Sequence, residues 1–297
     1  MKSLLDSLIL HPLNRQLLDQ FVAAPAHALL LTAPSGSGKY WLAKNLSTRL
    51  LGLPAQEAVD SYPYFIHVAK TAERQEITID DIRGLIHKLR LKTTGSAAIR
   101  RIILIEDAHL MSLEAQTAIL KILEEPPLDT VFILTATALH ALLPTVVSRS
   151  QRMEIFGADL AAAQEHFAGQ YSQTEITKAW SLSGGRVGLL TALLADEQTH
   201  PLKAALSQVK QFMAATDSQR LLFMRSLDSS RADLAAFIEA AGRIMQILHH
   251  QALANNKAVL AAKLEFNRRT ISQSRKQLAA NVQVRLIGLN LALNLRS

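Results

Sequence analysis

The sequence predicts an α/β protein that begins with a three-layer domain around a mostly parallel, five-stranded sheet and continues with helices alone. In the first half of the 297-residue chain, short apolar runs alternate with segments of helical period. This alternation is typical of parallel strands that are joined by helices. From residue 157 onward only helical patterns remain, which predicts an all-α remainder.

A glycine-rich turn follows the first predicted strand, residues 27–32, and precedes a predicted helix at residues 41–51. A phosphate-binding P-loop is expected in this context, because glycines let backbone N–H groups converge on phosphate oxygens and a lysine adds positive charge. The alternative is an ordinary Gly-Ser turn with an incidental lysine. The predicted phosphate contacts are Pro34, Ser35, Gly36, Ser37, Gly38, Lys39 and Tyr40.

The turn departs from the P-loop pattern G-x-x-x-x-G-K-[ST] at two positions. Ala33 stands in place of the first glycine, and Tyr40 stands in place of the small hydroxyl residue. The second departure has the larger consequence, because that hydroxyl supplies an oxygen to Mg²⁺ and a phenol on a rigid ring lies too far out to replace it. The loop could still hold phosphates through its backbone and Lys39, without the metal geometry that hydrolysis needs.

The next predicted strand and helix are residues 64–68 and 78–91. The strand is a short apolar run that follows a loop rich in turn residues. Thr78 and Asp81 have the spacing of a capping box, which predicts that a helix begins there. The apolar residues that follow keep a helical period.

The central predicted strand, residues 102–105, is an unbroken apolar run that suits a strand covered on both faces. Glu106 and Asp107 follow it directly. Because ligands of open α/β sheets bind at the carboxyl ends of the strands, these acids lie where a nucleotide with Mg²⁺ would be handled. The alternative is a strand that ends in two solvated acids. The next predicted helix has Ser112 as its N-cap, and Pro126 and Pro127 forbid its continuation.

Two more strands complete the predicted sheet, at residues 131–135 and 152–156. Beyond residue 157, helices are predicted at 160–167, after the capping box of Ser172 and Glu175, and at 187–194, 231–254 and 274–295. The predicted domains are a nucleotide-binding domain at residues 1–156, a lid at 157–196 and a helical domain at 197–297. The broad apolar faces of the last part favour either a bundle with its own core or packing on sister subunits.

Composition limits the kinds of site and the location. The chain has no cysteine, which excludes disulfides and Cys-ligated zinc and fits a reducing, cytoplasmic location; no metal site is predicted. Asp6 interrupts the N-terminal apolar stretch, so a signal peptide is not expected, and no segment is apolar over the length of a membrane span. The net charge of +7 permits contact with polyanions such as nucleic acid, although an ordinary basic protein would show the same excess.

With these motifs in view, the chain resembles the AAA+ clamp-loader family. Three segments are similar to the P-loop, the Walker B strand with its helix, and the Ser-Arg-Cys motif of that family: HALLLTAPSGSGK, RRIILIEDAHLMSLEAQTAILKILEEPP and LLPTVVSRSQ. The resemblance covers the chain well up to residue 194 and continues only through length, helical character and a similar ending. It implies a RecA-like ATPase domain, a three-helix lid and a collar domain through which five subunits assemble.

The resemblance also implies roles for single residues. Thr137 looks like the sensor after the fourth strand, Arg186 lies near the position of a lid sensor, and Arg149 looks like an arginine finger that acts on a neighbouring subunit's nucleotide. For both arginines the alternative is a solvated side chain. Glu106 and Asp107 reverse the aspartate–glutamate order typical of the motors of this family, which predicts a non-hydrolysing stator.

Ligands and partners follow from the same resemblance. It implies ATP or ADP, with Mg²⁺ when nucleotide is bound, and no zinc, because the cysteine-based zinc module usual after the P-loop is missing. The implied partners are loader subunits of the gamma/tau and delta kinds in a hetero-pentamer and, through the complex, the sliding clamp and primed DNA, without a membrane. Two alternatives stay open: an active gamma/tau-like ATPase of the same loader, and an unrelated P-loop phosphotransferase.

Overall fold

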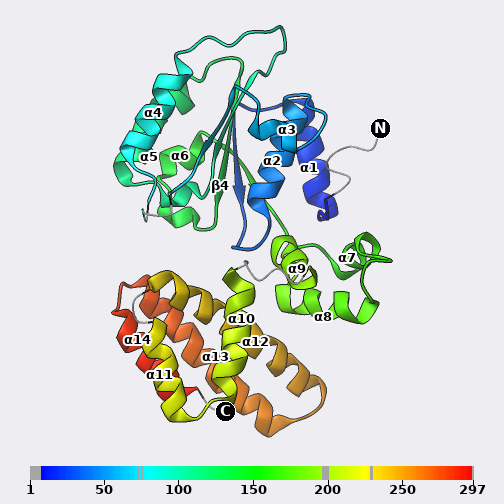
Figure 1. Ribbon diagram of the computed structural model, residues 1–297, viewed down its shortest axis with the longest axis vertical. Helices are drawn as coiled ribbons and strands as arrows, with labels where there is room; N and C mark the ends of the chain where they lie inside the picture. Colours follow the sequence, from blue (N-terminus) through cyan, green and yellow to red (C-terminus); the bar gives the residue numbers. More distant parts are fainter. Residues whose placement is uncertain (1–7, 72–73, 75, 196–200, 228–229, 296–297) are drawn as a thin grey trace. The chain divides into compact units, whose positions relative to one another are not determined.

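The chain forms two compact units, residues 1–166 and 167–297, in the computed structural model (Figure 1). The structure describes residues 8–71, 74, 76–195, 201–227 and 230–295. The first unit contains the sheet, and the second is helical. The predicted division into three domains stays a prediction.

The first unit is built on a five-stranded sheet in which every pair of neighbouring strands is parallel. The strand order is β2-β3-β4-β1-β5. The strands are β1 Ala28–Thr32, β2 Phe65–Val68, β3 Arg101–Ile105, β4 Thr130–Ala136 and β5 Gln151–Glu154. The predicted parallel sheet of five strands is therefore confirmed, with strand ends that differ from the predicted ones by a few residues at most.

Helices cover both faces of this sheet, which makes the predicted three layers (Figure 1). On one face lie α1 Pro12–Ala23 and α2 Lys39–Leu50; on the other lie α4 Ile79–Leu89, α5 Leu113–Glu124 and α6 Pro144–Ser148. Successive side chains of a strand point to opposite faces. Leu29 and Leu31 thus pack with α1 and α2, and Leu30 packs with α4 and α5. Because both faces are covered, the three inner strands β3, β4 and β1 are buried throughout.

Helix ends in this unit follow the predicted signals. Ser112 caps α5 by accepting a hydrogen bond from the backbone N–H of Ala115, and α5 ends at Glu124, before the two prolines. The capping box of Thr78 and Asp81 is present at the start of α4. The remaining short elements are α3 Glu57–Asp60, η2 Ala108–Leu110, η3 Leu139–Ala141 and α7 Leu160–His166.

The second unit consists of helices around a core of its own. They are α8 Gln173–Ser183, α9 Val187–Leu194, α10 Pro201–Ala214, α11 Asp217–Leu227, α12 Arg231–Ala254, α13 Ala258–Ala279 and α14 Val284–Asn294. The predicted all-α remainder is thus confirmed. None of the described helices combines the length and the apolar character that a membrane crossing requires.

The prediction of one continuous helix over residues 274–295 is wrong. The chain leaves α13 at Ala279 and enters α14 at Val284. Asn281 between them has φ 59°, in the left-handed region where asparagine commonly ends a helix. The apolar spacing continues on both sides of this turn, so periodicity by itself did not reveal it.

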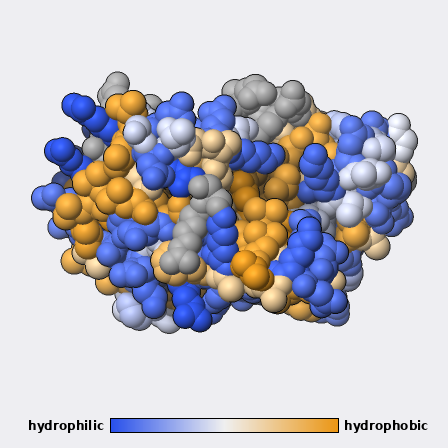
Figure 2. All heavy atoms as spheres, turned by 90° about the horizontal axis from the view of Figure 1, so that it is seen from below, coloured by the Kyte–Doolittle hydropathy of each residue, from blue (hydrophilic) through white to orange (hydrophobic). Residues whose placement is uncertain are grey.

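Several large apolar side chains stay exposed on the second unit. On α14, Leu286, Leu289 and Leu293 are exposed and recur at a spacing that puts them on one side of a helix. Val259 and Leu260, on α13, are exposed as well. Apolar patches between charged side chains are visible on the face of the molecule drawn in Figure 2.

Candidate nucleotide site

The predicted P-loop is the turn between β1 and α2. Gly36 and Gly38 have φ of 78° and 82°, a conformation that side chains with a Cβ rarely adopt. Gly38 is the N-cap of α2, so the first backbone N–H groups of that helix are presented by the turn. Glycine therefore occupies both of these positions of positive φ. The loop leads into the N-terminus of α2, and helix N-termini of this kind bind anions.

The side chain of Lys39 folds back and contacts the backbone of its own loop. Lys39 is 7 % exposed, and its Nζ donates to the carbonyl oxygen of Pro34 at 3.3 Å. The hydroxyl of Ser37 donates to the same oxygen at 2.7 Å. The loop residues predicted from the sequence are thus brought together around one turn, with the lysine charge inside it.

The two acids after β3 take different positions. Glu106 Oε2 lies 3.0 Å from Nε2 of His67, at the end of the neighbouring strand β2. Asp107 has φ 48°, and its backbone N–H donates to the hydroxyl of Thr135 at 2.9 Å. This left-handed residue turns the chain out of the sheet immediately after Glu106. Only Glu106 is therefore paired with a side chain of the β2 edge.

Tyr40 packs on the same histidine. The ring centroids of Tyr40 and His67 are 5.3 Å apart, and Nζ of Lys44 lies 5.6 Å from the Tyr40 ring centroid. Lys44 is held by Asp60 at 2.6 Å. Burial raises the pKa of the Tyr40 phenol, so the phenol is neutral at physiological pH. The place that a P-loop normally gives to a small hydroxyl is filled here by a packed aromatic ring.

His67 was missed by the sequence analysis. The sequence signal is partial: His67 lies near the carboxyl end of a predicted strand, where ligands of parallel sheets bind, but the sequence does not say which strand lies beside it. His67 pairs in register with Leu104, two residues before Glu106. Only the strand pairing makes it a neighbour of the acid.

A second missed histidine binds the predicted sensor residue. The backbone N–H of Thr137 donates to Nδ1 of His109 at 3.4 Å, and Nε2 of His109 lies 2.7 Å from the Thr137 hydroxyl. Because Nδ1 accepts, the proton of the neutral ring belongs on Nε2, which donates to that hydroxyl. The structure therefore joins Thr137 to the segment after the acids through His109.

The neutral ring of His109 predicts a pH dependence of stability. Burial lowers the pKa of His109 from 6.5, and this effect outweighs the opposing charge of Asp107. Between the lowered pKa of His109 and about pH 6.5, the unfolded chain binds more protons than the folded one. The free energy of unfolding therefore falls as the pH falls through this window, by at most about 1.4 kcal/mol per pH unit. Urea unfolding of His109→Gln should show a weaker fall between neutral and mildly acidic pH. The exposed His87→Gln serves as control, and an unchanged slope for His109→Gln would contradict the prediction.

Arg149 lies on the helix layer opposite to the P-loop helix. It follows α6 directly, pairs with Glu124 of α5 at 2.5 Å, and donates to the carbonyl of Thr145 at 3.2 Å. These partners all belong to the α5–α6 side of the first unit. Within the described residues, the structure does not bring Arg149 to the chain's own P-loop, and its predicted role toward a neighbour stays a prediction.

Arg186 belongs to the second unit. It is the N-cap residue of α9 and forms an ion pair with Glu239 of α12. Arg243, one turn along α12, also lies near Glu239, at 3.6 Å, and donates to the carbonyl of Ser183 at 2.5 Å. Burial lowers the pKa of Arg243 to about 10. Arg186 thus takes part in a link between α9 and α12, and its predicted sensor role stays a prediction.

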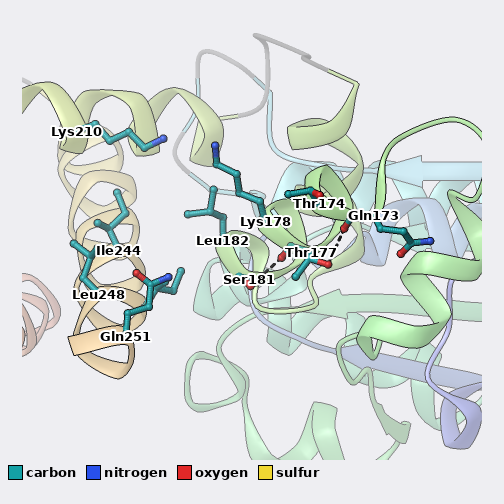
Figure 3. A pocket seen from close by; sticks show the side chains of 11 residues that line it. Gln173, Thr174, Thr177, Lys178, Ser181, Leu182, Lys210, Ile244, Leu248 and Gln251 are labelled. Atoms are coloured by element: carbon teal, nitrogen blue, oxygen red, sulfur yellow. Dashed lines mark hydrogen bonds between the residues drawn. The ribbon is translucent and has the colours of Figure 1, made fainter. Parts of the chain in front are cut away.

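The second unit also has an open pocket of about 670 Å³ (Figure 3). Its apolar wall includes Ile244 and Leu248 of α12, and Lys178 and Lys210 also line it, without an acidic side chain among the lining residues. The hydroxyl of Ser181 donates to the carbonyl of Thr177 within α8. None of the lining residues belongs to the predicted site motifs. Arg186 is the predicted site residue that lies nearest to them in the sequence.

Metal ligands do not gather around the loop. Among the residues that the structure describes, no three histidine, cysteine or acidic side chains are placed to hold a metal ion. The side chains of His67 and Glu106 form a hydrogen bond with each other. What the site offers is a glycine turn, the Lys39 charge and the start of α2.

Comparisons with known proteins find relatives among DNA polymerase III subunits. The family model described as DNA polymerase III, delta subunit, matches residues 13–158. DNA polymerase III subunit delta' of Pseudomonas aeruginosa is 36% identical over 141 residues, which are 43% of this chain and 42% of that protein. DNA polymerase III subunit tau of Bacillus subtilis is 30% identical over 139 residues, 43% of this chain and 24% of that protein. The matches span less than half the length of these relatives.

The fold has a relative among solved structures. The crystal structure of a DNA polymerase III gamma subunit-related protein from Thermotoga maritima aligns with a TM-score of 0.54 and 17% sequence identity, covering 95% of this chain and 99% of that one. At this identity the likeness concerns the fold alone. Together with the family match at residues 13–158, these findings show that the chain is similar to subunits of DNA polymerase III, delta' and tau among them.

Proposed function

We propose that this chain is a stator subunit of a replicative clamp loader, in the DNA polymerase III holoenzyme. In this role it assembles with subunits of the gamma/tau and delta kinds and helps the complex to place the sliding clamp on primed DNA. Support comes from the match of residues 13–158 to the family model of a DNA polymerase III subunit and from the 36% identity to a delta' subunit over 141 residues. The nucleotide site is degenerate, and ATP is hydrolysed by neighbouring subunits.

The proposal depends on the side chains that stand where a P-loop protein holds Mg²⁺. Tyr40 replaces the small hydroxyl and packs on His67, and His67 pairs with Glu106. Hydrolysis of a nucleotide requires Mg²⁺ to bridge phosphate oxygens and a polarised attacking water. The metal requirement falls on Tyr40 and Glu106, whose side chains are already engaged within the chain.

Two alternative functions are an active ATPase of the same loader and an unrelated phosphotransferase. An active gamma/tau-like ATPase is favoured by the similarity to a tau subunit and by the intact glycine turn with Lys39. An unrelated P-loop phosphotransferase would need no similarity to polymerase subunits, so the matches weigh against it. The acid order Glu106-Asp107 and the ring of Tyr40 favour the stator over the active ATPase.

The second unit offers surface for assembly. Leu286, Leu289 and Leu293 are 55%, 38% and 67% exposed along one side of α14. An exposed apolar stripe of this kind is typical of helices that pack on other chains. We assign the collar contacts with neighbouring subunits to this side of α14.

The purified chain should hydrolyse ATP negligibly and should assemble with the other loader subunits. The measurement is steady-state phosphate release by the isolated chain, followed by size-exclusion chromatography with the purified partner subunits. Lys39→Ala tests the site, and Lys88→Ala, an exposed lysine on α4, is the matched control. Sustained turnover that disappears in Lys39→Ala but not in Lys88→Ala would establish an active ATPase and overturn the stator role.

A further inference from the structure

We infer that Tyr40, His67 and Glu106 exclude a divalent cation from the P-loop, so that the site binds the phosphate groups of a nucleotide without Mg²⁺. The inference rests on the proposed function, because it takes residues 33–40 as a nucleotide loop. It adds the form of the ligand: a free nucleotide anion in place of a magnesium complex. It also gives His67 a role in specificity.

The first argument concerns the ligands that Mg²⁺ needs. This ion requires a near-octahedral shell of oxygens at about 2.0–2.1 Å and gives up its water reluctantly. In a P-loop one of these oxygens is the hydroxyl that follows the lysine. Here that position is the Tyr40 phenol, which is carried at the far end of a ring that packs on His67. The loop therefore lacks its own ligand for the metal.

The second argument concerns the acid. Glu106 Oε2 is 3.0 Å from His67 Nε2, and both side chains are 32% exposed. A nitrogen donor at this distance takes one acceptor position of the carboxylate. This hydrogen bond restrains the Glu106 carboxylate toward the β2 edge and leaves it fewer acceptor positions for Mg²⁺ or its water shell. His67 thus lies beside the carboxylate at the end of β3, where a metal ion would otherwise approach.

The third argument concerns what holds His67 there. Its ring lies against Tyr40, and the Tyr40 ring lies below the Lys44 ammonium, which is fixed by Asp60 at 2.6 Å. Aromatic and cation–π contacts of this kind stabilise the relative placement of the rings and the ammonium. Moving His67 away from Glu106 would disturb its contact with Tyr40 and, through that ring, the contact of Tyr40 with Lys44. The arrangement is therefore stable without a ligand.

What remains of the loop needs no metal to bind an anion. The backbone N–H groups at the start of α2 and the charge of Lys39 are both attractive to phosphate oxygens. Neither depends on Glu106 or on the hydroxyl that Tyr40 replaced. The loop can hold a phosphate group while the metal side stays closed.

The test is calorimetric titration of the full-length chain with ADP and with ATP, once with excess Mg²⁺ and once with EDTA. The wild type should give dissociation constants that agree within about twofold in the two media. The double variant Tyr40→Ser/His67→Ala frees Glu106 and restores a small hydroxyl, so Mg²⁺ should tighten its binding by about tenfold or more. His87→Ala, an exposed histidine on α4, is the control and should behave as the wild type.

Three results would overturn the inference. One is wild-type binding that Mg²⁺ tightens tenfold or more; another is a double variant that folds, as judged by its thermal unfolding, and gains no Mg²⁺ dependence. The third is a wild type that binds neither nucleotide in either medium. That last result would leave the stator role intact, because assembly with the partner subunits tests it separately. If the double variant does not fold, the wild-type comparison still decides, and the His67 imidazole resonances should not shift when Mg²⁺ alone is added.

Discussion

Replacing Arg149 by alanine should slow ATP hydrolysis at the neighbouring site of the reconstituted loader by about 10³- to 10⁵-fold, the usual cost of losing an arginine finger. The reason is that a guanidinium supplied by a neighbour stabilises charge on the transferred phosphoryl group. Arg149 is 34% exposed at the end of α6 and has its partners on the α5–α6 side of the first unit. The measurement is DNA-stimulated ATPase turnover and clamp loading, with assembly confirmed by size.

Two further variants separate a finger from a structural arginine. Glu124→Gln keeps Arg149 but weakens its ion pair within the chain, so turnover should be retained. Arg83→Ala removes an exposed arginine of α4, which pairs only with its helix neighbour Asp80, and should have no effect. If Glu124→Gln slows turnover as much as Arg149→Ala, the ion pair itself is what matters, and the assignment of Arg149 to a neighbour's nucleotide fails.

Replacing Arg220 by alanine should lower the free energy of unfolding by about 3 kcal/mol, because buried polar groups would lose their partner. Arg220 is 2% exposed within the second unit. Its guanidinium donates to the carbonyls of Phe212, Met213 and Leu295 at 3.0, 3.1 and 2.6 Å. It also lies over the Phe212 ring, 5.3 Å from the centroid. One side chain thus joins the end of α10 to the chain that follows α14.

Urea unfolding monitored by far-UV circular dichroism measures this loss. Arg269→Ala is the matched control, since Arg269 is 80% exposed and its pair with Glu265 lies on the same helix. Exposed arginines of this kind usually contribute within about 0.5 kcal/mol. A loss below about 1 kcal/mol for Arg220→Ala would mean that water replaces the guanidinium at these carbonyls.

The local features of the fold could be predicted because their causes act within a few residues. The apolar runs of β1, β3 and β4 indicate strands covered on both faces, and they are buried throughout. Capping by Ser112 depends on a side chain three residues from its partner. The break at Asn281 was missed although it is local, because the apolar spacing on either side also fits a continuous helix.

In the candidate site, too, some features follow from the sequence and others only from the tertiary structure. The sequence by itself determined a glycine turn with Lys39, an acid pair at a strand end and the absence of a small hydroxyl at Tyr40. Only the tertiary structure decided that His67 pairs with Glu106, because 39 residues separate them and the contact depends on the pairing of β2 with β3. Strand pairing is a non-local choice that covers both faces of a sheet, so no residue spacing encodes which side chains meet at its edge.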